Sequence, residues 1–333
     1  MKRYLQTLAF FIVVATALPF VIGTALGIDE SSIVSTEPEK MTENSLEHSN
    51  SNASTVKDRF TVLVTKTGET VSLSLEELTA RVLYAEMPAS FELEALKSQA
   101  VAIRSFILYA AEHPQDDDRH PNADICTDHT HCVAYRTYED AVEAYGVITA
   151  DDTYSVMVDA VEATEGVYIT YDSEPINAVF HGASYGNTES CLNIWGADVP
   201  YLQSVPTPES ASEFEERRAF LPSELQTLLE PLEIEFTYNP SNWIETITKN
   251  SSGRVDTVDI CGSIVSAKQL RSLLSLRSTN FTVEFTCGYF VFTTVGYGHG
   301  VGLSQYGAEL LAQDGADYRE ILAHYYPNTT ISS

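Results

Sequence analysis

Residues Gly296 to Ala308 read GYGHGVGLSQYGA, with glycine at every second position from 296 to 302. Because glycine has no side chain, this spacing indicates backbone that turns sharply or passes close to a neighbour. The apolar run Tyr289 to Val295 just before it predicts a strand. Residues Ser304 to Gln313 after it predict a helix capped by Ser304. The stretch therefore predicts a strand, a glycine-rich loop and a helix in succession.

This loop lacks the two common patterns for binding nucleotides. Counted from Gly296, the dinucleotide fingerprint needs a third glycine where the chain has Val301, and a phosphate loop needs a Gly-Lys-Ser or Gly-Lys-Thr ending. With no cation nearby, a neutral polar ligand such as a sugar suits the loop better than a phosphate. A tight turn whose glycines serve only backbone packing is the alternative.

Length and charge set the broad class of the protein. The 333 residues are 44% hydrophobic, which is enough for one large or two smaller packed units. Nineteen basic and 47 acidic residues give a net charge of -28. Such an acidic chain argues against nucleic acid and anionic membrane surfaces as partners.

The N-terminus has the pattern of a membrane anchor. Lys2 and Arg3 precede residues 4–28, which carry no charge and at about 1.5 Å per residue can cross a hydrocarbon core of roughly 30 Å. The charge asymmetry places residues 1–3 in the cytoplasm and the rest of the chain outside. A cleaved signal peptide is the alternative. Residues 29–58, rich in Ser, Glu, Asn and Thr, predict a disordered acidic tether.

The folded part, residues 59–333, mixes strand and helix patterns. Alternation predicts strands, Ser74 and Glu77 predict a capping box, and Pro88 stops the helix that follows. The strands are predicted at 60–64, 70–73, 167–171, 176–181, 243–248 and 255–260, and two further helices at 91–111 and 153–164. We expect an α+β fold of mixed helices and antiparallel strands, with a smaller β-rich lobe inserted at about 206–285.

Several segments together resemble a known family, that of stage II sporulation protein D, whose domain is shared with amidase-enhancer proteins. They occur in the family's order and cover essentially everything from Phe60 to the end. Besides the glycine loop, the segments are Glu86-Met87-Pro88, Glu94 to Arg104 (EALKSQAVAIR), Trp195-Gly196, Pro200-Tyr201-Leu202, Ser252-Gly253-Arg254, Leu276 to Phe281 (LRSTNF) and His324-Tyr325-Tyr326-Pro327.

The resemblance implies a membrane-anchored lytic transglycosylase that cleaves peptidoglycan glycan strands, preferably strands stripped of stem peptides, during engulfment of the forespore. It also implies a partner cell-wall amidase and other membrane-anchored engulfment proteins. The larger lobe would be catalytic and extracytoplasmic, on the mother-cell membrane facing the intermembrane space. The family's catalytic acid falls on Glu86.

The chemistry of Glu86 can be argued from its surroundings. Glycosidic cleavage needs a carboxylic acid that is protonated near neutral pH. Glu86 stands among Leu83, Tyr84, Ala85 and Met87, an apolar setting that would raise its pKa on burial. Ordinary glycosidases use two carboxylates. A lytic transglycosylase needs one, because the substrate's own 6-hydroxyl closes a 1,6-anhydro ring. An ordinary glutamate at a helix end is the alternative.

The predicted saccharide groove is lined by polar and aromatic residues of the two glycine-punctuated loops. We expect His181, Ser184, His299, Gln305 and Tyr306 to contact the sugar. Where relatives have a glycine in a serine-rich loop, this chain has Tyr185, which weakens the assignments in that loop.

Arg104 is a further candidate for substrate binding. It belongs to the segment EALKSQAVAIR that carries the resemblance. A polar residue on a helix is, however, more often solvated or structurally paired than functional.

A second chemical cluster lies in HPNADICTDHTHC, residues 120–132. His120, Cys126, His131 and Cys132 are the four predicted ligands of a structural zinc ion, with His129 as the substitute. A disulfide between Cys126 and Cys132 is the alternative outside the cytoplasm. The remaining cysteines, Cys191, Cys261 and Cys287, have no motif spacing and are predicted to be buried thiols.

Two other functions fit parts of the sequence. A non-catalytic wall-binding protein that enhances an amidase would not need Glu86. A serine hydrolase could use Ser184 with His181 or His299, but the sequence around Ser184 does not form a G-x-S-x-G nucleophile elbow.

Overall fold

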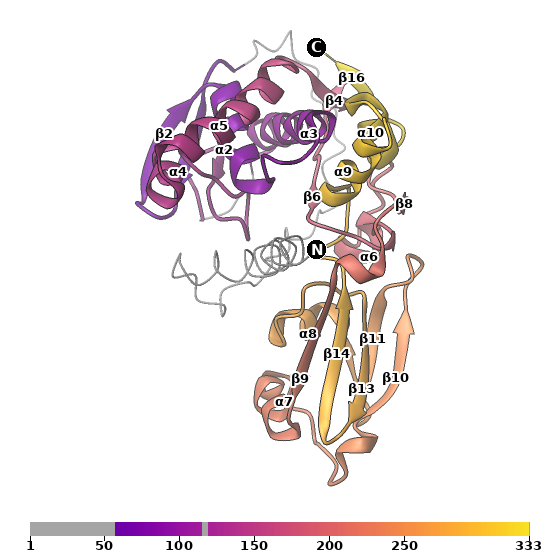
Figure 1. Ribbon diagram of the computed structural model, residues 1–333. Coiled ribbons are helices and arrows are strands. Elements are labelled where there is room, and N and C mark those ends of the chain that lie inside the picture. Colours follow the sequence, from indigo (N-terminus) through magenta and orange to yellow (C-terminus); the bar gives the residue numbers. More distant parts are fainter. Residues whose placement is uncertain (1–56, 115–118, 333) are drawn as a thin grey trace, which may run out of the picture. The chain divides into compact units, whose positions relative to one another are not determined.

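The structure is a computed structural model that describes residues 57–114 and 119–332 (Figure 1). This part is α+β, with helices and several small, mostly antiparallel sheets mixed along the chain, in agreement with the predicted class. The predicted anchor at 4–28 and all but the last two residues of the tether at 29–58 lie outside it. Of the helices in the described ranges, none is both long and apolar enough to cross a membrane.

From β1 to β8 the described chain forms five α-helices and eight strands. In order they are β1 (Phe60–Val64), β2 (Glu69–Leu73), α2 (Leu75–Glu86), α3 (Leu93–Glu112), β3 (Ile125–Cys126), α4 (Tyr138–Tyr145), α5 (Val147–Glu162), β4 (Tyr168–Tyr171), β5 (Glu174–Pro175), β6 (Phe180–His181), β7 (Gly186–Asn187), α6 (Cys191–Trp195) and β8 (Pro206–Thr207).

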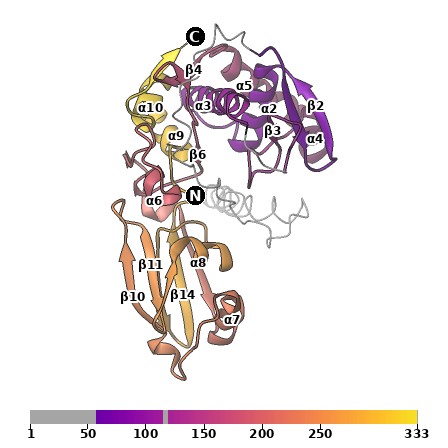
Figure 2. The same cartoon turned by 180° about the vertical axis from the view of Figure 1, so that it is seen from behind.

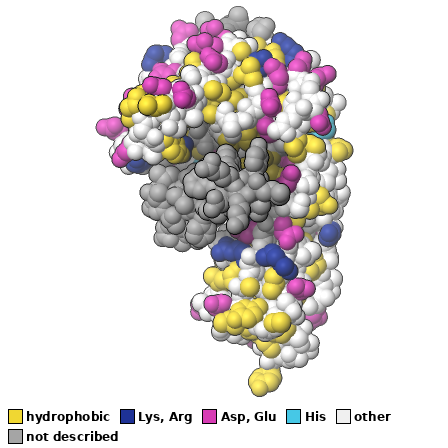
Figure 3. Space-filling view, viewed as in Figure 1, with side chains coloured by type: hydrophobic (Ala, Val, Ile, Leu, Met, Phe, Trp, Pro, Cys, Tyr) yellow, Lys and Arg dark blue, Asp and Glu magenta, His cyan; other side chains and the backbone are white. Residues whose placement is uncertain are grey.

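The rest of the chain begins with a β-rich region and ends with two helices. It contains η3 (Ala211–Glu213), β9 (Glu215–Phe220), α7 (Pro222–Leu228), η4 (Glu230–Leu232), η5 (Pro240–Asn242), β10 (Ile244–Lys249), β11 (Val255–Ile260), β12 (Ser263–Ser266), α8 (Ala267–Leu273), β13 (Phe281–Thr286), β14 (Tyr289–Val295), β15 (Leu303–Ser304), α9 (Gln305–Gln313), α10 (Tyr318–Tyr325) and β16 (Thr330–Ser332). Asp and Glu side chains are scattered over the face shown in Figure 3, as expected for so acidic a chain.

Helix α3 is the centre of the first hydrophobic core. Its Leu96, Ala100, Ile103 and Ile107 recur at helical spacing and are fully buried. Helices α2, α5, α9 and α10 all pack against it, as Figures 1 and 2 show. Through α3 the first and last helices of the described chain are brought into one packed group.

A second hydrophobic core is built from residues Phe220 to Phe292. It lies on two three-stranded sheets, ordered β10-β11-β12 and β13-β14-β9, with Trp243 stacked on Phe290 at 5.3 Å between ring centroids. Strand β14, predicted from the run before the glycine loop, pairs along its whole length with β9 and β13. The glycine loop therefore leaves this core and leads back to the first one.

The hairpin predicted after α5 is wrong in its second strand. β4 turns at Asp172 and Ser173, whose φ values of 52° and 72° are left-handed, and pairs with β5. The Ile176 N–H still donates to the Ile169 carbonyl of β4 at 3.1 Å, but the ladder goes no further along the predicted strand 176–181. Only Phe180 and His181 of that predicted strand pair, as β6 in parallel with β15. This pairing spans more than 120 residues, so no local pattern indicated it.

Candidate functional site

The two glycine-punctuated loops are hydrogen-bonded to each other. Ala183 and Tyr297 exchange backbone N–H···O bonds of 3.1 and 2.8 Å, and the Tyr306 N–H donates to the Gly182 carbonyl at 3.0 Å. At Gly302, φ is +71° and a Cβ would lie 2.0 Å from the Val179 carbonyl oxygen. The glycines thus serve close backbone contact between the loops, as their spacing predicted.

Glu86 is the last residue of α2. The helix ends there because Met87, which precedes Pro88, is extended with φ -127° and ψ 145°. The Ala134 N–H donates to Glu86 Oε1 at 3.0 Å, and Gln305 Nε2 donates to Oε2 at 3.4 Å. The side chain keeps some exposure. Burial nevertheless raises the pKa of this carboxyl, and the two hydrogen bonds and His129 lower it by less.

Gln305 and Tyr306 open helix α9. Ser304 caps that helix by accepting from the Gly307 N–H at 3.4 Å, as predicted, and this directs Gln305 to Glu86. The Tyr306 ring is 40% exposed. It meets Phe91 and Phe214 edge-on, with ring centroids 5.0 and 4.7 Å away. An exposed aromatic face thus follows directly on the residue that contacts Glu86.

His181 and Ser184 lie beneath the surface. His181 is 4% exposed and Ser184 is fully buried. His181 Nδ1 lies 3.1 Å from the Val301 carbonyl, which can only accept, so Nδ1 carries the proton and Nε2 accepts from the Ser184 hydroxyl at 2.6 Å. Arg254 donates to the same hydroxyl at 2.8 Å. The pair orders the loop, and its burial leaves no path for a substrate to the serine oxygen.

His299 lies between the loops and α6. Its ring packs against Trp195, 5.2 Å between centroids, and against His181 at 5.8 Å. The Val301 N–H donates to His299 Nδ1 at 3.0 Å. Burial, followed by the charges of Arg271 and Arg254, lowers the pKa of His299 to about 3, so the ring is neutral at physiological pH.

Arg104 is placed elsewhere. It has no exposed surface, and its guanidinium donates to the Glu76 carboxylate and, at 2.8 Å, to the Val167 carbonyl. These bonds tie α3 to α2 and to the chain before β4. The structure therefore does not bring Arg104 to the group around Glu86, and its role is to hold helices together.

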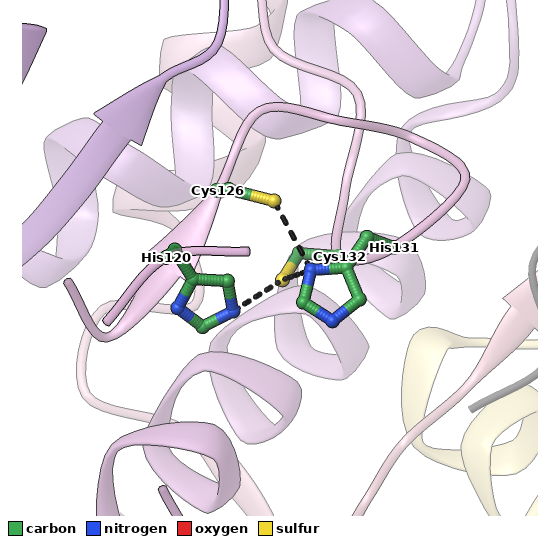
Figure 4. Close-up of side chains that lie close together, drawn as sticks. All are labelled: His120, Cys126, His131 and Cys132. Atoms are coloured by element: carbon green, nitrogen blue, oxygen red, sulfur yellow. Dashed lines mark hydrogen bonds between the residues drawn. The ribbon is translucent and has the colours of Figure 1, made fainter. Parts of the chain in front are cut away.

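The four predicted metal ligands meet in one cluster (Figure 4). The side-chain donor atoms of His120, Cys126, His131 and Cys132 all lie within 4.8 Å of one another. Hydrogen-bond distances of 3.3 Å join Cys126 Sγ to His131 Nδ1 and of 3.4 Å join Cys132 Sγ to His120 Nε2. All five cysteines are free thiols, so there is no bond between Cys126 and Cys132. Of the three cysteines predicted to be buried, Cys191 is buried and Cys261 half-buried, but Cys287 is exposed, so the prediction is wrong there.

Electrostatics within the cluster favour one thiolate. The hydrogen bond between the two thiols, together with His131, lowers the pKa of Cys126 to about 5, whereas that bond and burial raise the pKa of Cys132. His120 Nδ1 faces the Ala123 carbonyl at 3.0 Å, which leaves its Nε2 as the ligand atom. Two thiol sulfurs and two imidazole nitrogens are a donor set suited to tetrahedral Zn²⁺.

A cavity of about 710 Å³ adjoins this cluster. Its walls include His131 and Cys132 of the cluster, the aromatic residue Trp195, and His299. Imidazoles, hydroxyls and carboxamides share its polar part, and the carboxamides are those of Asn177, Asn193, Asn250 and Gln269. Glu86, Gln305 and Tyr306 are not part of this wall. Cys132 lines the cavity, however, and two residues further on the Ala134 N–H donates to Glu86.

Sequence reasoning missed several residues of this region. Trp195 and Arg254 stand in segments that carried the resemblance, which was the available signal. Ala134, Phe91, Phe214 and Glu209 had none, because a backbone N–H has no side-chain signature and the other three contact residues distant in sequence.

Comparisons with known proteins point to one family. The sequence model described as "Stage II sporulation protein" matches residues 64–171. Stage II sporulation protein D of Bacillus subtilis is 29% identical over 338 residues, covering all of this chain and 96% of the relative, and the protein of the same name from Bacillus amyloliquefaciens gives the same figures. A protein named amidase enhancer, also from Bacillus subtilis, is 25% identical over 300 residues, or 74% of this chain and 39% of that protein.

The matched sequence model and the similarity over the full chain place this mixed α+β protein among sporulation proteins. The chain belongs to the stage II sporulation protein D family, which has a role in sporulation.

Proposed function

We propose that the protein is a lytic transglycosylase of peptidoglycan, with Glu86 as the general acid and then the general base. The observation that carries this proposal is the setting of Glu86: its carboxyl has a raised pKa, and its hydrogen-bond partners are an amide N–H and a carboxamide. In the described part of the chain, no second carboxylate is bonded to it. One protonated carboxylic acid is what cleavage through the substrate's own 6-hydroxyl requires.

The reaction then uses Glu86 twice. The carboxylic acid protonates the glycosidic oxygen as the bond to the anomeric carbon breaks. The carboxylate so formed removes the proton from the muramyl 6-hydroxyl, whose oxygen bonds to the anomeric carbon and closes the 1,6-anhydro ring. Gln305 and the Ala134 N–H hold the carboxyl in place for both transfers. Tyr306 offers a ring face for a sugar next to this point.

The cavity is the second part of the proposed groove. A volume of about 710 Å³ lies in the range of ligand sites, and the carboxamides and hydroxyls of its wall, with Trp195 and His299, suit hydroxyl and acetamido groups. Because Nδ1 of the neutral His299 ring accepts from the Val301 N–H, its Nε2 carries the proton and can donate without adding charge. The proposed substrate is a glycan strand free of stem peptides, which a partner amidase would supply.

The test is release of soluble fragments from peptide-free glycan strands. Glu86→Gln should abolish release, by about a thousandfold or more, because the amide cannot transfer the proton. Glu77→Gln, a change of the same kind on the same helix, should leave release unchanged. Release that survives in Glu86→Gln would overturn the proposal.

A non-catalytic role is the second candidate, favoured by the similarity to the protein named amidase enhancer. Here the protein would bind glycan and raise the activity of a partner amidase. Glu86→Gln would then leave the stimulation of the amidase unaltered, and no glycan fragments would form with either variant.

We further propose that His120, Cys126, His131 and Cys132 hold a structural Zn²⁺. Bound there, the ion would supply no step of the cleavage; it would close the loop 120–132, two residues before the Ala134 N–H that holds Glu86. Metal analysis of protein purified without chelator should give one zinc per chain. Cys126→Ala should lose it and Cys261→Ala should retain it; a metal-free wild type would contradict the site.

For localisation, we propose that residues 4–28 anchor the chain in the membrane with the folded part outside. Support comes from the uncharged length of this segment and the basic residues before it. The intact N-terminus should be found in the membrane fraction by mass analysis. A mature chain that begins after residue 15 would show a cleaved signal peptide instead.

A further inference from the structure

A buried carboxylate, Glu209, connects the two glycine-punctuated loops. It is 3% exposed and follows β8. Its Oε1 accepts from the Ser184 backbone N–H at 3.0 Å and from the Ser304 hydroxyl, and its Oε2 accepts from the Thr207 hydroxyl. Glu209 thus fastens the first loop to the N-cap residue of α9.

Glu209 also fits the start of α9 electrostatically and sterically. The first turn of this helix has no acidic residue of its own, so the Glu209 carboxylate is the negative charge beside its positive end. At Gly307, in the same turn, a Cβ would lie 3.0 Å from Glu209 Oε2 and 2.0 Å from the Tyr325 hydroxyl oxygen. The first turn of α9 is packed closely on Glu209, so we expect a displacement of Glu209 to displace this turn.

The residue after Ser304 is Gln305, which donates to Glu86 across 219 positions of sequence. We propose that Glu209 is a positioning residue, which acts through Ser304 and the first turn of α9 to hold the Gln305 carboxamide against Glu86. Its effect on cleavage rests on the proposed function; its effect on the contact between Gln305 and Glu86 does not.

The chain offers a matched control in Glu189. This glutamate is also fully buried, and like Glu209 it lies close enough to Arg254 to interact with its charge. Its side chain accepts hydrogen bonds from the carboxamides of Asn193 and Asn250, both at 2.7 Å, and from the Ser190 N–H at 3.1 Å. Loss of either glutamate removes one buried charge near Arg254, but only Glu209 is bonded to the start of α9.

The first experiment needs no enzymatic activity. The sample is the full-length, ¹⁵N-labelled protein in detergent micelles. The side-chain NH₂ resonance of Gln305 is assigned by its disappearance in Gln305→Ala. A shift of this resonance in Glu86→Gln shows that it reports on the contact between Gln305 and Glu86. Glu209→Ala should move it in the same direction as Glu86→Gln, and Glu189→Ala should leave it in place. Ser304→Ala removes the hydrogen bond between Glu209 and the start of α9, so it should shift the Gln305 resonance as Glu209→Ala does. It replaces Glu209→Ala if the Glu209→Ala protein does not fold.

The second experiment measures glycan cleavage as a double-mutant cycle. Glu209→Ala should lower kcat by about tenfold with little change in KM, the loss of one oriented hydrogen bond. In a Gln305→Ala background the same change should cost less than about twofold, because the two residues act in series.

The two experiments separate the two claims. A Gln305 resonance that ignores Glu209→Ala and Ser304→Ala, or that responds equally to Glu189→Ala, overturns the positioning role. A wild type that cleaves no glycan overturns the proposed function while the resonance still decides the role of Glu209.

Discussion

Among single residues, Glu86 is central to the proposed function because its carboxyl is costly to ionise. Burial raises the pKa of Glu86, and the hydrogen bonds from Ala134 and Gln305 offset part of that effect. The same enclosure that makes Glu86 a usable acid makes it a source of instability, because a raised folded-state pKa means that the native state loses stability once the carboxyl ionises.

Glu86→Gln should therefore stabilise the protein at high pH. Below the pKa that Glu86 has in the unfolded state, its carboxyl is neutral in both the folded and the unfolded protein. The stability that the protonated carboxyl contributes is lost as the pH rises through the raised pKa of the folded state. The melting temperature of Glu86→Gln should exceed that of the wild type by a margin that grows from pH 5 to pH 8. A constant or shrinking margin would show that the carboxyl has no raised pKa.

Gln305→Ala should move the pH profile of cleavage. The Gln305 hydrogen bond lowers the pKa of Glu86, so its removal raises that pKa and keeps Glu86 protonated at higher pH. The basic limb of kcat/KM against pH should shift upward even as the rate at the optimum falls. A downward shift would assign the basic limb to another group.

At the scale of elements, local patterns predicted what local physics determines. Strands β1, β11 and β14 and the Ser304 cap of α9 were found at or within a residue of their predicted positions, because alternation and capping act over a few residues. Helix α5 starts six residues before the predicted Thr153, directly after the positive φ of Gly146.

Non-local pairing is what the sequence could not indicate. The parallel pair β6 and β15 was missed, and with it the burial of His181 and Ser184. The ion pair between the buried Arg104 and the partly exposed Glu76, which keeps Arg104 from the group around Glu86, also forms between separate helices. No sequence pattern predicts the contact between Glu86 and Gln305. It could be expected only because the proposed chemistry needs the two segments to meet at one groove.

Gly302 tests the close packing of β6 and β15. Gly302→Ala should destabilise the protein by about 3 kcal/mol or more in urea unfolding, since it adds a backbone clash at Val179 to the strain of a positive φ. Gly315→Ala, where φ is +97° and no atom lies within 4 Å of the Cβ position, should cost about 1 kcal/mol. Equal losses of unfolding free energy in the two variants would mean that the positive φ alone accounts for the need for glycine at both positions.

At the scale of the whole chain, the proposed site is assembled from distant segments. Glu86 comes from the end of α2, Ala134 from the segment after the metal-ligand cluster, and Gln305 from the start of α9. Helix α3 holds α2 and α9 in one core, and the β6–β15 pair joins the glycine loops. The proposed function therefore depends on contacts across the complete described fold.

The chemical nature of the cleaved ends tests the central claim most directly. Purified full-length protein is incubated with peptide-free glycan strands, and the products are analysed by mass. The account predicts fragments that end in 1,6-anhydro-muramyl residues, lighter by one water than hydrolysis products, and their loss in Glu86→Gln. Reducing ends, which require an attacking water, or intact strands under all conditions would contradict it.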